Sequence, residues 1–283
     1  MRWRDLRRST NVRDLRGRRP RMGFPLPLGR RGGGLGIIVV VVIVFVLGGP
    51  EALNLLVGGG VPMTGEPPST RGAALDDEAG EFVAAILGST EDVWGALFSE
   101  RGARYVPPEL TLFEGAVQSA CGFASSAAGP FYCPSDRRVY LDTSFFRDLA
   151  RMGGPGDFAQ AYVIGHEIGH HVQTLLGTAA EVREAQARRG QDGVNRIQVA
   201  MELQADCYSG VWAHHANRRD RVLEPGDVQE GLAAAAAIGD DRLQRNAGRR
   251  VTPDSFTHGS SAQRQRWLEA GLAAGDPGSC DTL

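Results

Sequence analysis

Half of the six histidines of this chain lie in one short stretch, VIGHEIGHHVQ at positions 163–173. Within it, His166, Glu167 and His170 follow the spacing H-E-x-x-H. Side chains four residues apart share one face of a helix, so both imidazoles can reach one metal ion. Glu167 lies about 100° around the helix from His166, where its carboxylate can reach a water on the metal. The spacing predicts a Zn²⁺ site with a general base beside it.

The competing interpretation is a chance match in a helix that is rich in histidine. We estimate such a match at on the order of one in a hundred for a chain of this length and histidine content. Gly165 and Gly169 flank the ligands, although glycine costs a helix interior about 1 kcal/mol relative to alanine. Their presence predicts that another part of the chain, or a ligand, packs very close to this helix.

A catalytic zinc site needs a third protein ligand and one open position. The longer motif H-E-x-x-H-x-x-G-x-x-H is absent, because Gln173 and Leu176 occupy its glycine and third histidine positions. The stretch AMELQADCYSG at 200–210 offers Glu202 and Asp206 instead, four residues apart among apolar neighbours. We expect Glu202 to be the third ligand and Asp206 to accept a hydrogen bond from a ligating histidine.

Other polar residues compete for these roles. Glu202 and Asp206 could be solvated carboxylates, and Glu181 and Glu184 are weaker rivals because REAQARR around them is typical of a solvated helix face. His171 lies about 140° from the His166 face, which favours a supporting role in the second shell over metal binding. His214 and His215 are expected at a helix end, where positive charge is favourable.

Charge divides the chain into two unlike parts. Residues 1–31 carry 11 arginines against two aspartates, a net charge of +9, whereas the rest carries −11. The following stretch has no charged residue from Gly32 to Gly49, and with its apolar neighbours it approaches the about 20 residues of a membrane-spanning helix. We therefore expect residues 1–31 to be a basic cytoplasmic tail and residues 32–57 to be a transmembrane signal anchor.

The positive-inside rule then places the remainder outside the cytoplasm, as a single-pass protein of the cell membrane. Residues 58–76 are rich in Gly, Pro, Ser and Thr and predict a flexible linker. A cleaved signal peptide is less favoured, because no small-x-small cleavage site follows Leu47. Arginines beside an apolar run serve topology and bind anionic lipid, so no nucleic-acid partner is expected.

Four cysteines form no C-x-x-C pair, which argues against a zinc ribbon. An even number outside the cytoplasm suggests two disulfides, and we expect Cys121–Cys133 and Cys207–Cys280. Four buried thiols are the alternative, and the sequence does not fix the pairing.

Residues 77–283 predict an α-rich α+β domain with a small sheet placed early. Residues 109–113 and 138–142 alternate like strands, and FYCPSDRRVYLD predicts two short strands around a turn. Ser89 is the expected N-cap of a second helix after EAGEFVAAILG. Helical patterns then dominate, at 144–152, 157–176, 195–216, 225–245 and 260–273.

The motifs together resemble a known family. HEIGH followed by ELQAD is similar to the gluzincin pattern, and the chain resembles the bacterial neutral zinc metallopeptidase family, whose members are membrane-anchored. GPFYCPSDRRVYLD, HEIGHHVQ, ELQADCYSGVWA and HGSSAQRQRW carry the likeness, together with the arginine-rich start and the glycine-rich entry to one apolar span. The resemblance implies a zincin-like fold, His166, His170 and Glu202 as ligands of one Zn²⁺ ion, and Glu167 as catalytic base.

Gluzincins also often supply a histidine or tyrosine that stabilises the oxyanion. His258, just before a helix capped by Ser260 or Ser261, is the candidate for this catalytic role, with Tyr208 and Arg264 as alternatives. Equally, His258 and Arg264 could be a structural pair that holds the last helix.

The expected activity is that of a zinc endopeptidase acting on a protein or peptide substrate. One alternative is a non-catalytic envelope module that keeps the fold and binds a partner. A weaker alternative is a metal-dependent amidase acting on cell-wall peptides. Substrate specificity is not readable from these residues.

Overall fold

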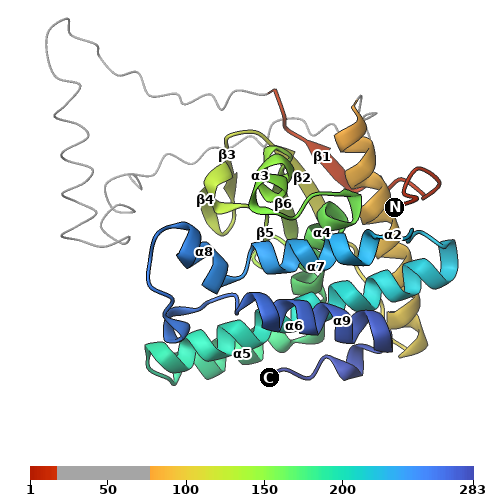
Figure 1. The fold of residues 1–283 in the computed structure, drawn as a ribbon. Helices are drawn as coiled ribbons and strands as arrows, with labels where there is room; N and C mark the ends of the chain where they lie inside the picture. The colour runs from red at the N-terminus through yellow and green to blue at the C-terminus, as the bar shows by residue number, and fades with distance from the viewer. Residues whose placement is uncertain (18–76) are drawn as a thin grey trace, which may run out of the picture. The chain divides into compact units, whose positions relative to one another are not determined.

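The computed structural model describes residues 1–17 and 77–283. The helices in these ranges are α2 Glu78–Glu100, α3 Ser144–Met152, α4 Asp157–Leu176, α5 Thr178–Ala187, α6 Gln191–Asp220, α7 Asp227–Ala237, α8 Asp240–Asn246 and α9 Ser261–Ala274. The strands are β1 Val12–Asp14, β2 Glu109–Phe113, β3 Ala116–Ser119, β4 Gly122–Ser125, β5 Phe131–Cys133 and β6 Arg138–Asp142. The fold is thus the helix-rich α+β arrangement with a small sheet that the sequence predicted (Figure 1).

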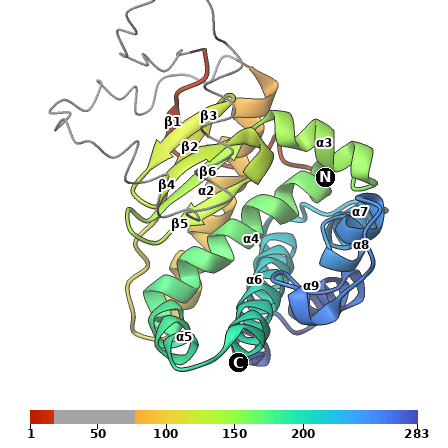
Figure 2. The same cartoon turned by 90° about the vertical axis from the view of Figure 1, so that its left-hand side faces the viewer.

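The main sheet has the strand order β1-β2-β6-β5. The strands β1, β2 and β6 run parallel, whereas β5 pairs antiparallel with β6 at the edge of the sheet. Strands β3 and β4 form a separate hairpin. The central strands β2 and β6 place Leu110, Leu112, Val139 and Leu141 in the main core. Figure 2 shows the edge strand β5 on the side of the sheet that faces α4.

Helix α4 packs against α6, and their contact depends on the two glycines beside the predicted ligands. A Cβ atom on Gly165 would lie 2.5 Å from Ser209 Oγ, and one on Gly169 would lie 2.9 Å from the Ala205 carbonyl oxygen. Both distances are shorter than real Cβ contacts, so a larger residue would displace the Ser209 side chain at the first position and the α6 backbone at the second. The close neighbour expected from these glycines is therefore confirmed, and it is the helix that carries Glu202.

Residues 1–17 belong to the same compact unit as the rest of the described chain. Strand β1 extends the sheet beside β2, and Trp3 is buried against Phe82 of α2. Arg7 binds Glu91 and Asp92 of α2. Three of the arginines that were expected to serve membrane topology, Arg4, Arg7 and Arg8, thus pair with acidic residues of α2.

This packing differs from the expected tail at residues 1–31. A single crossing at residues 32–57 would put residues 1–17 and 77–283 on opposite sides of a membrane, and the pairing of β1 with β2 does not allow that. The predicted span at 32–57 and the predicted linker at 58–76 lie outside the described residues. Among the helices that the structure describes, none has the length and apolar character needed to cross a membrane.

Two helix predictions are wrong, for local reasons. Ser89 does not cap a second helix, since α2 runs without a break and Ser89 Oγ accepts a hydrogen bond from Trp212 Nε1 at 3.1 Å. The helix expected over 225–245 is divided into α7 and α8. At this break the Asp240 carboxylate accepts hydrogen bonds from the backbone N–H groups of Thr257, His258 and Gly259. Asp240, at the break between α7 and α8, therefore holds the loop that precedes α9.

The cysteine pairing expected from the sequence is the one in the structure. Cys121 pairs with Cys133, which joins the β3–β4 turn to β5. Cys207 pairs with Cys280, which ties the C-terminal segment to α6.

Candidate metal centre

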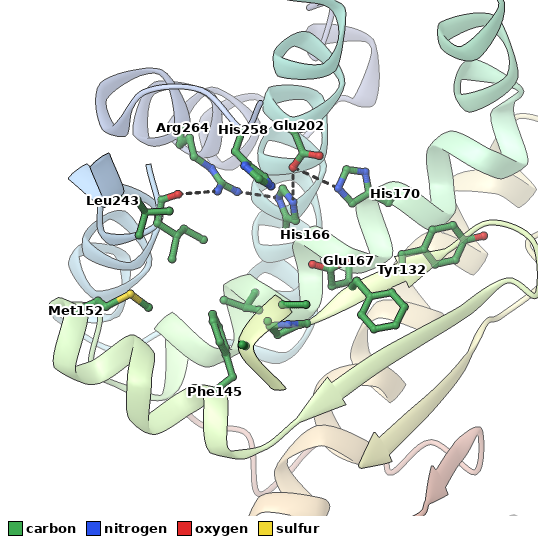
Figure 3. Close-up of a pocket in the computed structure, with 17 residues that line it drawn as sticks. Tyr132, Phe145, Met152, His166, Glu167, His170, Glu202, Leu243, His258 and Arg264 are labelled. Carbon is green, nitrogen blue, oxygen red and sulfur yellow. Dashed lines mark hydrogen bonds and ion pairs between the residues drawn. The ribbon is translucent and has the colours of Figure 1, made fainter. Parts of the chain in front are cut away.

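Three side chains from two helices converge at one point. His166 and His170 come from α4 and Glu202 from α6, and their ligand atoms lie within 4.8 Å of one another. Glu202 Oε2 lies 3.2 Å from His166 Nε2 and 3.5 Å from His170 Nε2 (Figure 3). The group lines a cavity of about 470 Å³. Helix α4 supplies the two expected histidines from one face, and the close approach of α6 brings Glu202 to them.

His166 is held through its other ring nitrogen. Its Nδ1 lies 2.8 Å from Asp206 Oδ1, and Asp206 is fully buried. Asp206 also accepts hydrogen bonds from Tyr162 and, through both oxygens, from Arg264. Arg264 Nη2 lies 3.3 Å from the same Nδ1, but an arginine can only donate. We assign Nδ1–H as the donor to Asp206, which leaves Nε2 free to bind a cation.

The charges around Asp206 explain its ionisation. Burial alone would raise the pKa of this carboxyl, but Arg264 and His166 lower it to about 2. Burial lowers the pKa of His166, yet the Asp206 carboxylate outweighs it and raises that pKa to about 10. The Glu202 pKa is well below its usual range, since the two histidines outweigh the opposing effect of burial. The site is thus a carboxylate-rich pocket that favours positive charge.

His170 is held by a chain of amides. Its Nδ1 lies 2.8 Å from Gln173 Oε1, and Gln173 Nε2 donates to the Met201 carbonyl at 2.8 Å and to Gln204 Oε1 at 3.0 Å. Gln204 Nε2 in turn donates to the Cys280 carbonyl at 3.0 Å. Two backbone carbonyls therefore fix the direction of every amide, so Gln173 presents an oxygen to His170. His170 must donate from Nδ1, which leaves its Nε2 lone pair facing Glu202.

Glu202 has a support of the same kind, because its Oε1 accepts a hydrogen bond from Gln198 Nε2 at 2.9 Å. His166, His170 and Glu202 therefore each point one acceptor atom toward the other two residues and hydrogen-bond a neighbouring residue through another atom. Three acceptor atoms that face one another repel unless a cation or proton lies between them. This donor set of two imidazoles and one carboxylate fits Zn²⁺, which takes nitrogen and oxygen ligands at catalytic sites.

Glu167 lines the same cavity and is 7% exposed. Among the described residues, none forms a hydrogen bond or an ion pair with its carboxylate. Its oxygens are therefore available to a water in the cavity, which is what a general base requires.

The candidates for oxyanion stabilisation are separated by the structure. His258 lines the cavity, and its Nδ1 lies 3.3 Å from Asp240 Oδ1. Arg264 also reaches the cavity, but it is bound to Asp206 and not to His258. The proposed His258–Arg264 pair is therefore absent from the described contacts. Tyr208 is buried against Trp94, 5.5 Å between ring centroids, and does not line the cavity.

The remaining histidines serve the fold. His171 donates from Nε2 to the Val106 carbonyl at 2.7 Å and faces the Tyr132 hydroxyl with Nδ1 at 3.1 Å. Burial lowers its pKa to about 4, which keeps it neutral. His214 and His215 bind carbonyls of Leu272 and Gly275 at the end of α9. None of these three belongs to the converging group.

Sequence reasoning missed the strand side of the cavity. Phe131 and Tyr132 of β5 line it beside α4. The FYC stretch was a predicted strand, but nothing in its residue types places it beside α4.

The comparisons with known proteins assign the chain to a family. The family model described as "Putative neutral zinc metallopeptidase" matches residues 1–283. The chain is 47% identical to the uncharacterized protein YpfJ of Escherichia coli K12 over 289 residues, which covers 100% of this chain and 99% of that protein. It is 45% identical to the uncharacterized protein Rv2575 of Mycobacterium tuberculosis over 212 residues, 71% of this chain and 69% of that protein. No solved structure matches it.

The family model spans the whole chain, and a relative of nearly equal length is close to half identical. The chain belongs to the family described as "Putative neutral zinc metallopeptidase".

Proposed function

We propose that this chain is a zinc-dependent endopeptidase that uses Glu167 as its general base. One observation carries the proposal: the acceptor atoms of His166, His170 and Glu202 converge in one cavity beside the Glu167 carboxylate, which has no partner among the described residues. A Zn²⁺ ion held there would polarise a carbonyl and make water more acidic. Membership of a family described as zinc metallopeptidases supports the same reaction.

Glu167 takes the proton of the attacking water as the water adds to the carbonyl carbon. The same carboxyl group then returns the proton to the nitrogen of the leaving amine. Its position on α4, one residue after His166, keeps it in the cavity but off the converging group. Proton transfer of this kind contributes about 10²- to 10⁴-fold to the rate.

His258 is the proposed oxyanion donor. Asp240 accepts a hydrogen bond from the His258 backbone N–H and lies 3.3 Å from its Nδ1, which places the ring at the wall of the cavity. Burial opposes ionisation of Asp240, but its hydrogen bonds with His258 outweigh this and lower the Asp240 pKa. A hydrogen bond from His258 to the carbonyl oxygen would strengthen as negative charge develops on that oxygen.

A peptide is the substrate that best fits the strand wall of the cavity. Strand β5 is at the edge of the sheet and pairs only with β6 among the described strands. An extended peptide can add to such an edge through backbone hydrogen bonds, whatever its sequence. This mode would bring a backbone carbonyl, rather than a particular side chain, to Glu167.

The test combines metal analysis with hydrolysis by the full chain. We expect about one zinc per chain after purification without chelator, and cleavage of an unfolded protein that stops with chelator and returns with zinc. The Glu167→Gln variant should keep zinc and lose cleavage by about 10²-fold or more. Zinc binding without any cleavage would favour the non-catalytic binding module. Purified chain without zinc would refute the proposal.

Membrane attachment is a separate proposal, supported by the apolar run within residues 32–57. Two disulfides favour a location of residues 77–283 outside the cytoplasm. The pairing of β1 with β2 then requires residues 1–17 on that same side. Thr10 and Gln191 are both exposed, one in each described range. Labelling of cysteines introduced at these two positions by a membrane-impermeant maleimide would test this, and labelling of only one position would contradict it.

A further inference from the structure

The converging group lies between two cavities rather than at the end of one. The cavity that holds Glu167 measures about 470 Å³, and a second of about 260 Å³ lies beyond His170. Tyr132, His170 and Glu202 line both. A chain that passes the metal ligands can therefore occupy space on both sides of them, which is the arrangement that internal cleavage of a polypeptide needs.

The first cavity has an apolar wall away from the ligands. Phe145 and Met152 of α3 line this wall together with Ile238 and Leu243, and Figure 3 shows Phe145, Met152 and Leu243 on the side away from His170. Leu243 is 37% exposed, which is unusual for a large apolar side chain in this domain. When an apolar side chain of a ligand packs against an exposed leucine, each Å² of apolar surface removed from water is favourable by about 25 cal/mol. This wall suits a large apolar side chain.

The second cavity has an exposed positive charge in its wall. Thr174, Gln186 and Gln198 line it together with Arg183 of α5. Arg183 is exposed, and within the described residues it forms no ion pair. Of the acidic residues beside it on α5, Glu184 is paired with Arg188, and neither Glu181 nor Glu184 lines the cavity. Glu202 lies at the opposite end, where the metal would offset its charge. Arg183 therefore suits an acidic side chain.

Strand β5 gives the two cavities an order. Phe131 lines the first, Tyr132 lines both, and Pro134, just after the strand, lines the second. The strand thus runs from the first cavity toward the second. A peptide paired antiparallel to β5, the more stable of the two pairings, would run in the opposite direction. Its amino-terminal side would enter the second cavity and its carboxyl-terminal side the first.

We propose that the enzyme selects extended segments with a large apolar residue just after the cleaved bond and an acidic residue before it. This inference rests on the proposed peptidase function and adds its specificity. Leu243 and Arg183 are the residues that would set the two preferences.

The test uses the zinc-loaded full chain and a peptide mixture from a digested proteome, with every cleavage site read by mass spectrometry. Wild-type sites should be enriched in Leu, Ile, Phe or Met after the cut and in Asp or Glu before it. Leu243→Asp should lower kcat/KM for the apolar peptides by about tenfold or more, because apolar pockets discriminate by about 10- to 200-fold. Arg183→Glu should shift the residue before the cut from acidic to basic.

Arg189→Glu is the matched control, since Arg189 is exposed just after the helix that carries Arg183, forms no ion pair within the described residues and lines neither cavity. Its cleavage pattern should equal that of wild type, and zinc content and melting temperature of all variants should be unchanged. Three results would overturn the inference and leave the peptidase function standing. They are cleavage without these preferences, cleavage with the two preferences reversed about the cut, and preferences that Leu243→Asp and Arg183→Glu leave unaltered. A wild-type enzyme that cleaves no peptide would instead remove the proposed function itself.

Discussion

Replacing Gln173 with leucine should weaken zinc binding by about 10- to 100-fold, the range expected when a group that orients a metal ligand is lost. Leucine removes the oxygen that accepts the Nδ1–H of His170 at 2.8 Å. His170 can then turn or change its tautomer, and either change takes the Nε2 lone pair away from the metal. The expected loss corresponds to about 1.4–2.8 kcal/mol of binding free energy.

The same change should also lower stability. Gln173 is fully buried and donates to the Met201 carbonyl and to Gln204 Oε1. Each buried acceptor left without a donor costs about 1–3 kcal/mol. Gln173→Glu separates the two effects, because a carboxylate still accepts from His170 but cannot donate to the other two groups. We expect Gln173→Glu to lose stability and keep zinc affinity, whereas Gln173→Leu loses both.

The assay is competition with a chromophoric chelator for the zinc Kd, with thermal unfolding of the zinc-free chain beside it. Gln191→Leu is the control, because Gln191 binds only Asn195 on the surface of α6. An unchanged zinc Kd in Gln173→Leu, with a lowered melting temperature, would show that Gln173 only supports the fold and would refute this reasoning.

Three further changes test other parts of the site. Zinc affinity should rise with pH up to about 10, the His166 pKa, because a proton on that imidazole competes with the metal. In the zinc-free chain, the stability that this proton provides is present below about pH 6.5 and is lost as the pH rises toward 10. The zinc Kd and the free energy of unfolding, both measured from pH 6 to 10, check the two directions. Gly169→Ala should destabilise the chain by about 1–3 kcal/mol and weaken zinc binding. The added Cβ would lie 2.9 Å from the Ala205 carbonyl oxygen and would push α4 away from α6. An unfolding curve that matches that of wild type would contradict this. Replacing Cys207 and Cys280 by serine should lower the free energy of unfolding in denaturant by about 2–4 kcal/mol. Because Gln204 donates to the Cys280 carbonyl, the disulfide is also linked to the amide chain that holds His170. A zinc Kd that stays unchanged would exclude coupling of the disulfide to the metal site through Gln204.

The sequence predicts the parts of the site that repeat with a helix. His166, Glu167 and His170 follow from spacing on α4, and Glu202 and Asp206 follow from the same spacing on α6. Gln173 was seen only as a departure from a longer motif. Its function depends on hydrogen bonds to Met201 and Gln204 across two helices, and no period within one helix reveals such a contact.

The failures in the fold have the same origin. Residues 12–14 read VRD within an arginine-rich stretch, and they form a strand only because β2 offers them an edge. Ser89 has the chemistry of an N-cap, but it lies inside α2 and binds Trp212 instead. Gly239 and Asp240 end α7 because Asp240 binds the backbone of the loop at 257–259. Each of these outcomes is decided by a partner far away in the sequence.

The contact between Arg16 and Asp77 has a practical consequence for producing the protein. Arg16 Nη1 lies 2.6 Å from Asp77 Oδ2, so the two borders of residues 18–76 meet at one point. A short glycine-serine connection could therefore replace residues 18–76 and preserve the described fold. Removing everything before residue 77, the usual way to solubilise an anchored protein, would instead strip β1 from β2 and leave an unpaired sheet edge that promotes aggregation. Internal excision, rather than amino-terminal truncation, is the design that this topology favours.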